Sequence, residues 1–105
     1  MTDASDKHLT GLRLRAAREA LGYNETRGRT QAAFYRVFGL SKARGNNWER
    51  GVSYVHPSFL KELHERFGIT ADWLILGRPD GLPARHAAKV ISNFRKIKEG
   101  NSADC

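Results

Sequence analysis

Residues 30–51, TQAAFYRVFGLSKARGNNWERG, constrain the fold of this chain more than any other stretch. Thr30 can cap a helix, because a threonine hydroxyl accepts a backbone N–H at a helix start. Apolar residues then recur at helical spacing until Gly39, which can enter the left-handed conformation without strain. Ser41 can cap a second helix, which is polar and basic except for Trp48, assigned to the core. The pattern predicts two short helices joined by a tight turn, a helix-turn-helix arrangement.

Further helices are predicted on both sides of this block, because apolar stripes of period 3–4 end at glycines. No segment shows the sustained alternation of a strand, so the fold class is all-α. The expected organisation is a polar, disordered tail over residues 1–8, a five-helix domain over residues 9–78, an amphipathic sixth helix over residues 82–99, and a tail over residues 100–105.

Several residues of this block match one known family. It is similar to the DNA-binding helix-turn-helix of the Cro/CI (lambda-repressor-like, XRE) family. The matching features are Thr30-Gln31 opening the first helix, Gly39 in the turn, Ser41 opening the second helix, and the run Trp48-Glu49-Arg50-Gly51. The likeness covers residues 9–78 and implies a five-helix DNA-binding domain whose second short helix enters the major groove.

The resemblance also implies which residues contact DNA. Lysine can donate to guanine, asparagine can pair with adenine, and alanine can meet a thymine methyl group. Phosphate contacts are expected around the entry to the first short helix and after the second. The predicted base-contacting residues are Ser41, Lys42, Ala43, Arg44, Asn46 and Asn47. The predicted phosphate-contacting residues are Arg27, Arg29, Thr30, Gln31, Arg50, Ser53 and Tyr54.

Two structural expectations and one difference in loop length accompany the resemblance. Arg18 matches a family arginine that pairs with the glutamate of the closing run, here Glu49, so these two are expected to form a structural ion pair. Tyr35 is larger and Gly45 smaller than the family's residues at facing positions, so we expect Tyr35 to pack over Gly45. The polar loop at residues 22–29 is longer than the family's turn, and its role is left open.

The predicted helix at residues 82–99 carries an apolar stripe that must be buried against something. Three partners are possible: its own domain, a second copy of the chain, or another protein. The candidates for dimerisation are Val90, Ile91, Phe94 and Ile97.

Charge and composition agree with a nucleic-acid partner and exclude several other classes. The net charge is +7, from 18 Lys and Arg against 11 Asp and Glu, which favours a polyanion. No apolar run suggests a membrane span or a secretory signal, and the single cysteine, Cys105, cannot form an internal disulfide, so a cytoplasmic location is expected. The four histidines lack metal-ligand spacing, and no nucleotide-binding or catalytic motif occurs, so no metal, cofactor or enzymatic activity is expected.

These observations lead to one expected function and several alternatives. The chain is expected to be a bacterial or phage transcriptional regulator, most simply a repressor, that reads a near-palindromic operator in double-stranded DNA as a homodimer. The alternatives are a transcriptional activator, an antitoxin or adaptor whose last helix binds a protein partner, and an RNA-binding protein. A-form RNA has a narrow major groove that does not admit a helix, which disfavours the last.

Overall fold

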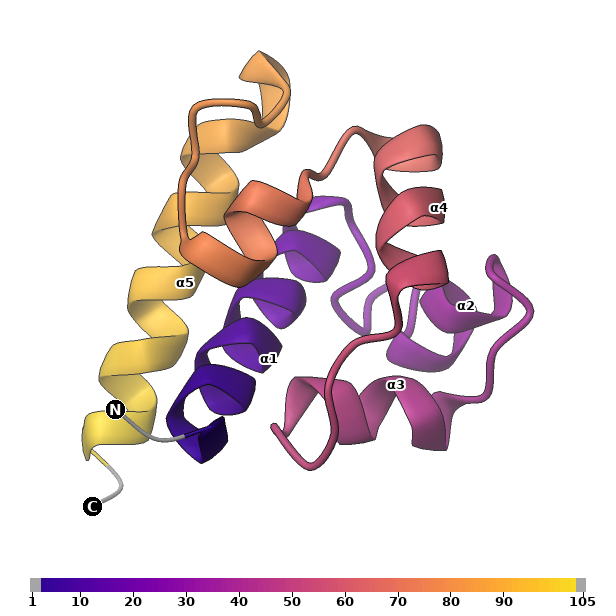
Figure 1. The fold of residues 1–105 in the computed structure, drawn as a ribbon. Helices are drawn as coiled ribbons and strands as arrows, with labels where there is room; N and C mark the ends of the chain where they lie inside the picture. Colours follow the sequence, from indigo (N-terminus) through magenta and orange to yellow (C-terminus); the bar gives the residue numbers. More distant parts are fainter. Residues whose placement is uncertain (1–2, 104–105) are drawn as a thin grey trace.

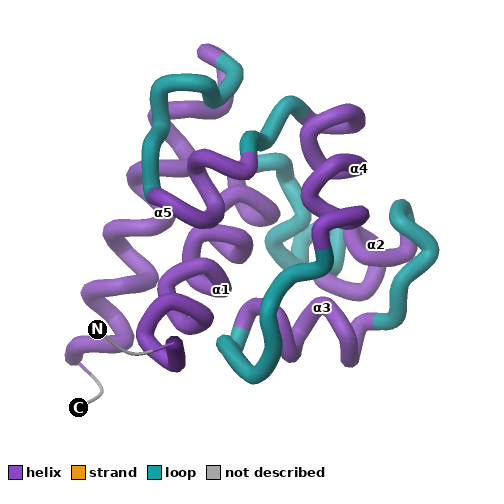
Figure 2. The backbone as a smooth tube through the Cα atoms, in the orientation of Figure 1, coloured by secondary structure: helices purple, strands orange, loops and turns teal. Residues whose placement is uncertain are grey.

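The computed structural model describes residues 3–103, and this part of the chain is all-helical (Figure 1). Figure 2 shows helices joined by loops, with no strand among residues 3–103. The predicted all-α class is therefore confirmed. In chain order the elements are α1 (Asp3–Ala20), α2 (Gln31–Arg36), α3 (Lys42–Glu49), α4 (Pro57–Phe67), the π-helical turn η1 (Asp72–Leu76) and α5 (Ala84–Ala103).

The predicted caps delimit α2 and α3. The Thr30 hydroxyl accepts the N–H of Ala33 at 3.1 Å, and the Ser41 hydroxyl accepts the N–H of Arg44 at 3.1 Å. Between the two helices, Gly39 has a φ of 71°, a conformation that costs a residue with a side chain more than it costs glycine. Because each capping contact spans three residues, the local sequence indicates where each of these helices begins.

The two terminal helices are longer than predicted. Helix α1 begins at Asp3, so residues 3–8 are helical where a disordered tail was expected. Acidic Asp6, near the start of the helix, favours its N-terminal end electrostatically, and the backbone of His8 packs closely on Gly51, where a Cβ would lie 2.9 Å from the His8 Cα. Helix α5 begins at Ala84 and continues to Ala103, beyond the predicted residues 82–99. The rest of the expected tails, residues 1–2 and 104–105, lies outside the described residues.

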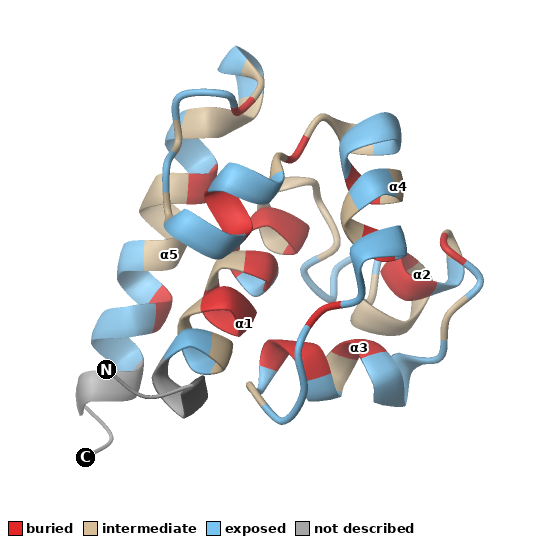
Figure 3. Ribbon diagram, viewed as in Figure 1, coloured by how far each residue is buried: buried red, intermediate tan, exposed pale blue. Residues whose placement is uncertain are grey.

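Helix α1 lies at the centre of the molecule and contacts α3, η1 and α5. Figure 3 shows its buried residues beside those of α3 and η1. On one side of α1, aromatic rings from α2 and the turn after it, from α3 and from α4 contact one another at centroid distances of 4.8–6.2 Å. This aromatic cluster fixes the position of α3, and it consists of Phe34, Tyr35, Phe38, Trp48 and Phe59. Over the described residues, no helix is both long enough and apolar enough to cross a bilayer.

Helix α5 packs against its own domain on the other side of α1. The Asn93 amide donates to the Ala16 carbonyl at 3.2 Å. Val90 is fully buried and Ile97 is 9% exposed, so these two dimerisation candidates are already covered by their own chain. For these two of the four candidates, the partner is therefore the chain's own domain. Only Ile91 and Phe94, which are partly exposed, remain accessible to another molecule.

The predicted packing of Tyr35 over Gly45 is confirmed. Both residues are buried, and a Cβ built on Gly45 would overlap the Tyr35 ring. Glycine inside a helix costs about 1 kcal/mol of stability relative to alanine. The Tyr35 ring explains why position 45 is nevertheless glycine, because any side chain there would overlap the ring.

We expect Gly45→Ala to lower the stability of the fold although alanine is the better helix former. Overpacking costs about 1–3 kcal/mol, which exceeds the propensity gain of about 1 kcal/mol. Urea unfolding measures the difference. Gly100→Ala in α5 is the matched control, since nothing lies within 4 Å of that added Cβ, and it should not destabilise. A higher melting temperature for Gly45→Ala would contradict this packing.

Candidate nucleic-acid interface

Helix α3 has one buried face and one exposed face. Gly45, Trp48 and Glu49 are buried against α1 and α2. At 100° per residue, the opposite side of the helix is centred on Ala43 and Asn47, which are exposed, with exposed Arg50 following at the C-cap. The exposed face therefore combines a small residue, an amide and a cation, without a large apolar side chain.

The other predicted base-contacting residues flank this face. The side-chain amide of Gln31 donates to the side-chain Oδ1 of Asn46 at 3.3 Å, which ties α2 to α3. The guanidinium of Arg44 lies over the Trp48 ring, 5.7 Å from its centroid, and so is directed away from the centre of the face. The Ser41 hydroxyl is engaged in capping.

Lys42, Ala43 and Asn47 are the three predicted base-contacting residues whose side chains remain uncommitted. All three are exposed. Within the part of the chain that the structure describes, Lys42 and Asn47 make no side-chain hydrogen bond or ion pair. They are therefore the side chains of α3 that can bind a new partner without breaking an existing contact.

The long loop before α2 forms a tight hairpin-like turn. The N–H of Glu25 donates to the Arg29 carbonyl and the N–H of Arg29 to the Thr26 carbonyl, both at 2.9 Å. The two central residues, Arg27 and Gly28, have φ values of 51° and 77°, as in the primed turns that reverse a chain most tightly. The turn leaves the Arg27 side chain exposed at its tip.

The base of this loop is anchored to the aromatic cluster. The Tyr23 ring lies 5.3 Å from Phe34 and 6.4 Å from Phe67. The Arg29 guanidinium lies over the Tyr23 ring, 5.6 Å from its centroid. The loop is thus held in place, and it carries both predicted phosphate-contacting arginines, Arg27 and Arg29, beside the start of α2.

The first backbone N–H of α2, where a phosphate contact was predicted, already has a partner. The Glu25 carboxylate accepts the N–H of Gln31 at 2.6 Å, and it lies 3.9 Å from the Arg18 guanidinium. A carboxylate therefore already occupies a position that was expected to suit a phosphate. The sequence did not indicate this contact, because it depends on the left-handed conformation of Glu25, whose φ is 72°.

The expected ion pair between Arg18 and Glu49 is present and buried. Arg18 donates to the two carboxylate oxygens of Glu49 at 2.8 and 3.0 Å, and the Tyr35 hydroxyl donates to the same carboxylate. Burial alone would lower the pKa of Arg18, but the hydrogen bonds and charge of Glu49 outweigh it and raise that pKa. Glu49 is the last residue of α3, so this network fixes the C-terminal end of α3 against α1.

The Tyr35 hydroxyl makes the fold less stable as the pH rises into the alkaline range. Burial, followed by the charge and hydrogen bond of Glu49, raises the pKa of Tyr35 far above its ordinary value. Above about pH 10 the unfolded chain loses a proton that the native chain keeps, so stability falls by about 1.4 kcal/mol per pH unit.

Tyr35→Phe should be less stable than the wild type at neutral pH but should lose stability more slowly as the pH rises above about 10. Urea unfolding at a series of pH values measures the difference between the two proteins. Parallel losses in wild type and variant would show that Tyr35 titrates in the native state as it does when unfolded.

The remaining predicted phosphate-contacting residues lie around α3. Ser53 and Tyr54 are exposed in the loop that follows it, and Lys7 of α1 lies over the Tyr54 ring at 5.3 Å. Thr30 is partly exposed, with its hydroxyl committed to the cap. Within the described residues, no three His, Cys, Asp or Glu side chains are grouped so as to hold a metal ion. Comparisons with protein-family models, curated proteins and solved structures find no match to this chain.

Proposed function

We propose that this chain is a sequence-specific DNA-binding regulator of the lambda-repressor-like kind, which places α3 in the major groove of duplex DNA. The observation that carries the proposal is the exposed face of α3, where Lys42, Ala43 and Asn47 are uncommitted while the opposite face is fixed in the core. A groove-reading helix needs both properties, because base contacts require available side chains held in a rigid register.

The chemistry of this face suits base edges. The Asn47 amide can pair with an adenine through one donor and one acceptor, and the Lys42 ammonium can donate to a guanine. Ala43, at the centre of the face, allows the helix backbone to approach the bases closely and can contact a thymine methyl group. In this arrangement Asn46 braces α3 rather than reading a base, because its side-chain oxygen already accepts a hydrogen bond from the Gln31 amide.

Basic and polar residues on either side of α3 would bind the phosphates. Arg27 and Arg29 lie before α2, whereas Arg50, Ser53 and Tyr54 follow α3. Each phosphate neutralised contributes about −0.9 to the slope of log affinity against log salt concentration. Bound over a promoter, the protein would block transcription. Two copies on a near-palindromic operator would place their α3 helices about 34 Å apart.

Binding-site selection from a random duplex library tests this proposal, with wild type and Asn47→Ala compared at near-physiological salt. Wild type should enrich one motif, and the variant should lose the preference at one base of it. A two-fold-symmetric motif would indicate two copies on the DNA, whereas a single half-site would indicate a monomer. If wild type enriches no motif, or if duplex RNA competes as strongly as the selected DNA, the proposal is wrong.

Under this proposal, Glu25→Gln should tighten DNA binding. Glutamine keeps an acceptor for the Gln31 N–H but removes a negative charge from the phosphate-facing surface. A carboxylate about 4 Å from a phosphate costs roughly 1 kcal/mol in water, so affinity should rise about fivefold. Glu65→Gln, an exposed change on α4, is the control. Titrations at rising salt should show the gain diminishing, and an unchanged or weaker affinity would contradict the prediction.

A further inference from the structure

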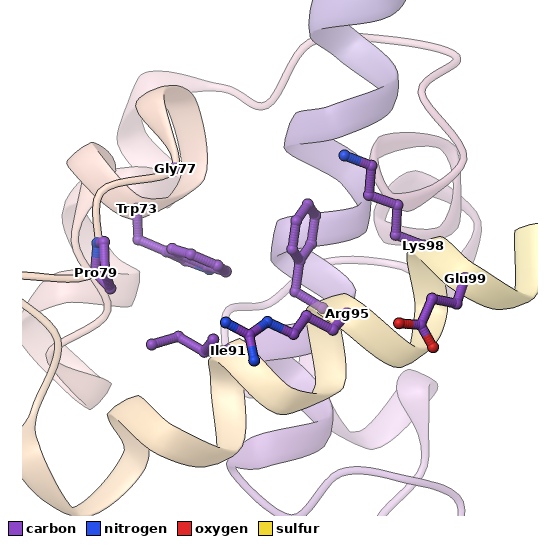
Figure 4. Close-up of a pocket in the computed structure, with 8 residues that line it drawn as sticks. Trp73, Gly77, Pro79, Ile91, Arg95, Lys98 and Glu99 are labelled. Carbon is purple, nitrogen blue, oxygen red and sulfur yellow. The ribbon is translucent and has the colours of Figure 1, made fainter. Parts of the chain in front are cut away.

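An apolar groove runs along the outer side of α5, away from α3. Its larger part is a hollow of about 860 Å³ between α5 and η1. A second hollow of about 440 Å³ continues it along α5, and the two share Ile91, Arg95 and Glu99. Figure 4 shows Trp73 reaching from η1 toward α5, with Ile91 and Arg95 beside it. Helix α1 separates the groove from α3, so both surfaces are accessible at once (Figure 1).

The dimensions of the groove suit a helix. Its α5 side extends over residues 88–99, which is about 16 Å at 1.5 Å per residue, or three helical turns. The small side chains of Ala88 and Ser92 lie one turn apart along it, which lets a second helix approach closely. Ile91 and Phe94, both partly exposed, supply the apolar surface, together with Trp73. Such a groove accepts an amphipathic helix through side chains at i, i+3 or i+4, and i+7.

The charge of the groove selects among possible helices. Its lining contains Arg95, Lys96 and Lys98 against a single acid, Glu99. Among residues 6–100, whose side chains the structure describes, none of these three cations forms an ion pair with an acid. Behind the groove, the Arg13 guanidinium lies 5.8 Å from the Phe94 centroid and adds a further positive charge. Complementarity therefore favours a ligand with acidic flanks.

The same charges disfavour a second copy of this chain as the occupant. A two-fold-symmetric pair places the same patch on both sides of the interface, so the cationic residues of one copy would face those of the other. Like charges placed together in an interface oppose association. The apolar centre of the groove can bury the apolar face of a partner, but its cationic rim opposes the binding of a second copy of this chain.

We propose that the groove between α5 and η1 binds an acidic amphipathic helix of another protein. The partner could bind in this way while α3 is also occupied, because the two surfaces do not overlap. The proposal stands on the groove alone and does not require that α3 binds DNA.

The test is selection from a phage-displayed library of short helices with a fixed leucine face and randomised flanking positions, against the full chain. Wild type should enrich flanks rich in Asp and Glu. Arg95→Glu/Lys98→Glu should instead enrich Lys and Arg, while the matched control Arg85→Glu/Lys89→Glu, outside the groove, should keep the acidic preference. This reversal distinguishes a charged binding surface from a structural role of the same residues.

Ile91→Glu supplies a second measurement, because it places a charge at the apolar centre of the groove. A selected peptide should bind it about 30-fold more weakly, the effect of losing a central anchor, while the melting temperature stays close to wild type. Enrichment of no binder, flanks without an acidic preference, or peptides that bind Ile91→Glu equally well would overturn the proposal. So would a wild-type dimer in sedimentation that Ile91→Glu dissociates.

Discussion

Arg18→Met should lower the free energy of unfolding by about 3–5 kcal/mol, because it leaves a buried carboxylate without its cation. Arg18 and Glu49 are 5% and 6% exposed, so water cannot replace the missing partner. The Tyr35 hydroxyl would remain as a hydrogen-bond donor to Glu49, but it carries no charge. A loss of this size is a large fraction of the stability of a small domain.

A matched variant at an exposed ion pair shows whether the loss of stability comes from burial of the pair or from breaking any ion pair. Arg15 is also on α1 and pairs with Glu19 at 2.9 Å, but its side chain is 45% exposed. An exposed pair at i,i+4 contributes only about 0.3–0.5 kcal/mol, so Arg15→Met should scarcely change the urea midpoint. If Arg18→Met costs no more than Arg15→Met, the buried pair does not stabilise the fold.

Adding Glu49→Gln to Arg18→Met should restore part of the lost stability. The double variant removes the uncompensated charge, and the glutamine can still accept from Tyr35 and occupies a similar volume. The two substitutions should therefore combine to much less than the sum of their separate effects, as expected of directly contacting residues. Urea unfolding of the wild type, both single variants and the double variant gives the coupling free energy between Arg18 and Glu49.

Contacts between near neighbours in the sequence were the ones most readily predicted. Thr30 and Ser41 each cap a helix through a residue three positions away, and the residue types alone indicate that contact. The pairing of Tyr35 with Gly45 was predicted from the family resemblance, in which these positions face each other and the gain in volume at one matches the loss at the other. Arg18 and Glu49 are 31 positions apart, and only the family resemblance linked them.

Other features depend on geometry that the residue types do not specify. Glu25 reaches the start of α2 only because its backbone is left-handed, a conformation that glutamate seldom adopts. The stripe on α5 indicated that one face is buried but not against which element. The groove beside Ile91 arises because α5 crosses α1 and η1 and leaves part of that stripe uncovered, and this depends on the tertiary packing.

The double variant Lys42→Ala/Asn47→Ala should abolish sequence-specific recognition by the proposed DNA-binding surface while the fold stays intact. Each side chain is exposed and makes no side-chain hydrogen bond or ion pair among the described residues, so the melting temperature should change little. Two lost base contacts, at about 1–3 kcal/mol each, should weaken binding to the selected duplex by roughly 30-fold to 10⁴-fold. Fluorescence anisotropy with the selected and a scrambled duplex measures both effects.

Arg27→Ala is the informative counterpart, because Arg27 lies exposed at the tip of the loop before α2. Loss of a phosphate contact should weaken binding to both duplexes alike and reduce the salt slope by about 1. Lys89→Ala, on α5 and across α1 from α3, controls for net charge alone. If Lys42→Ala/Asn47→Ala weakens both duplexes equally, α3 supplies charge without reading bases. Specificity would then have to come from another surface or from a partner protein.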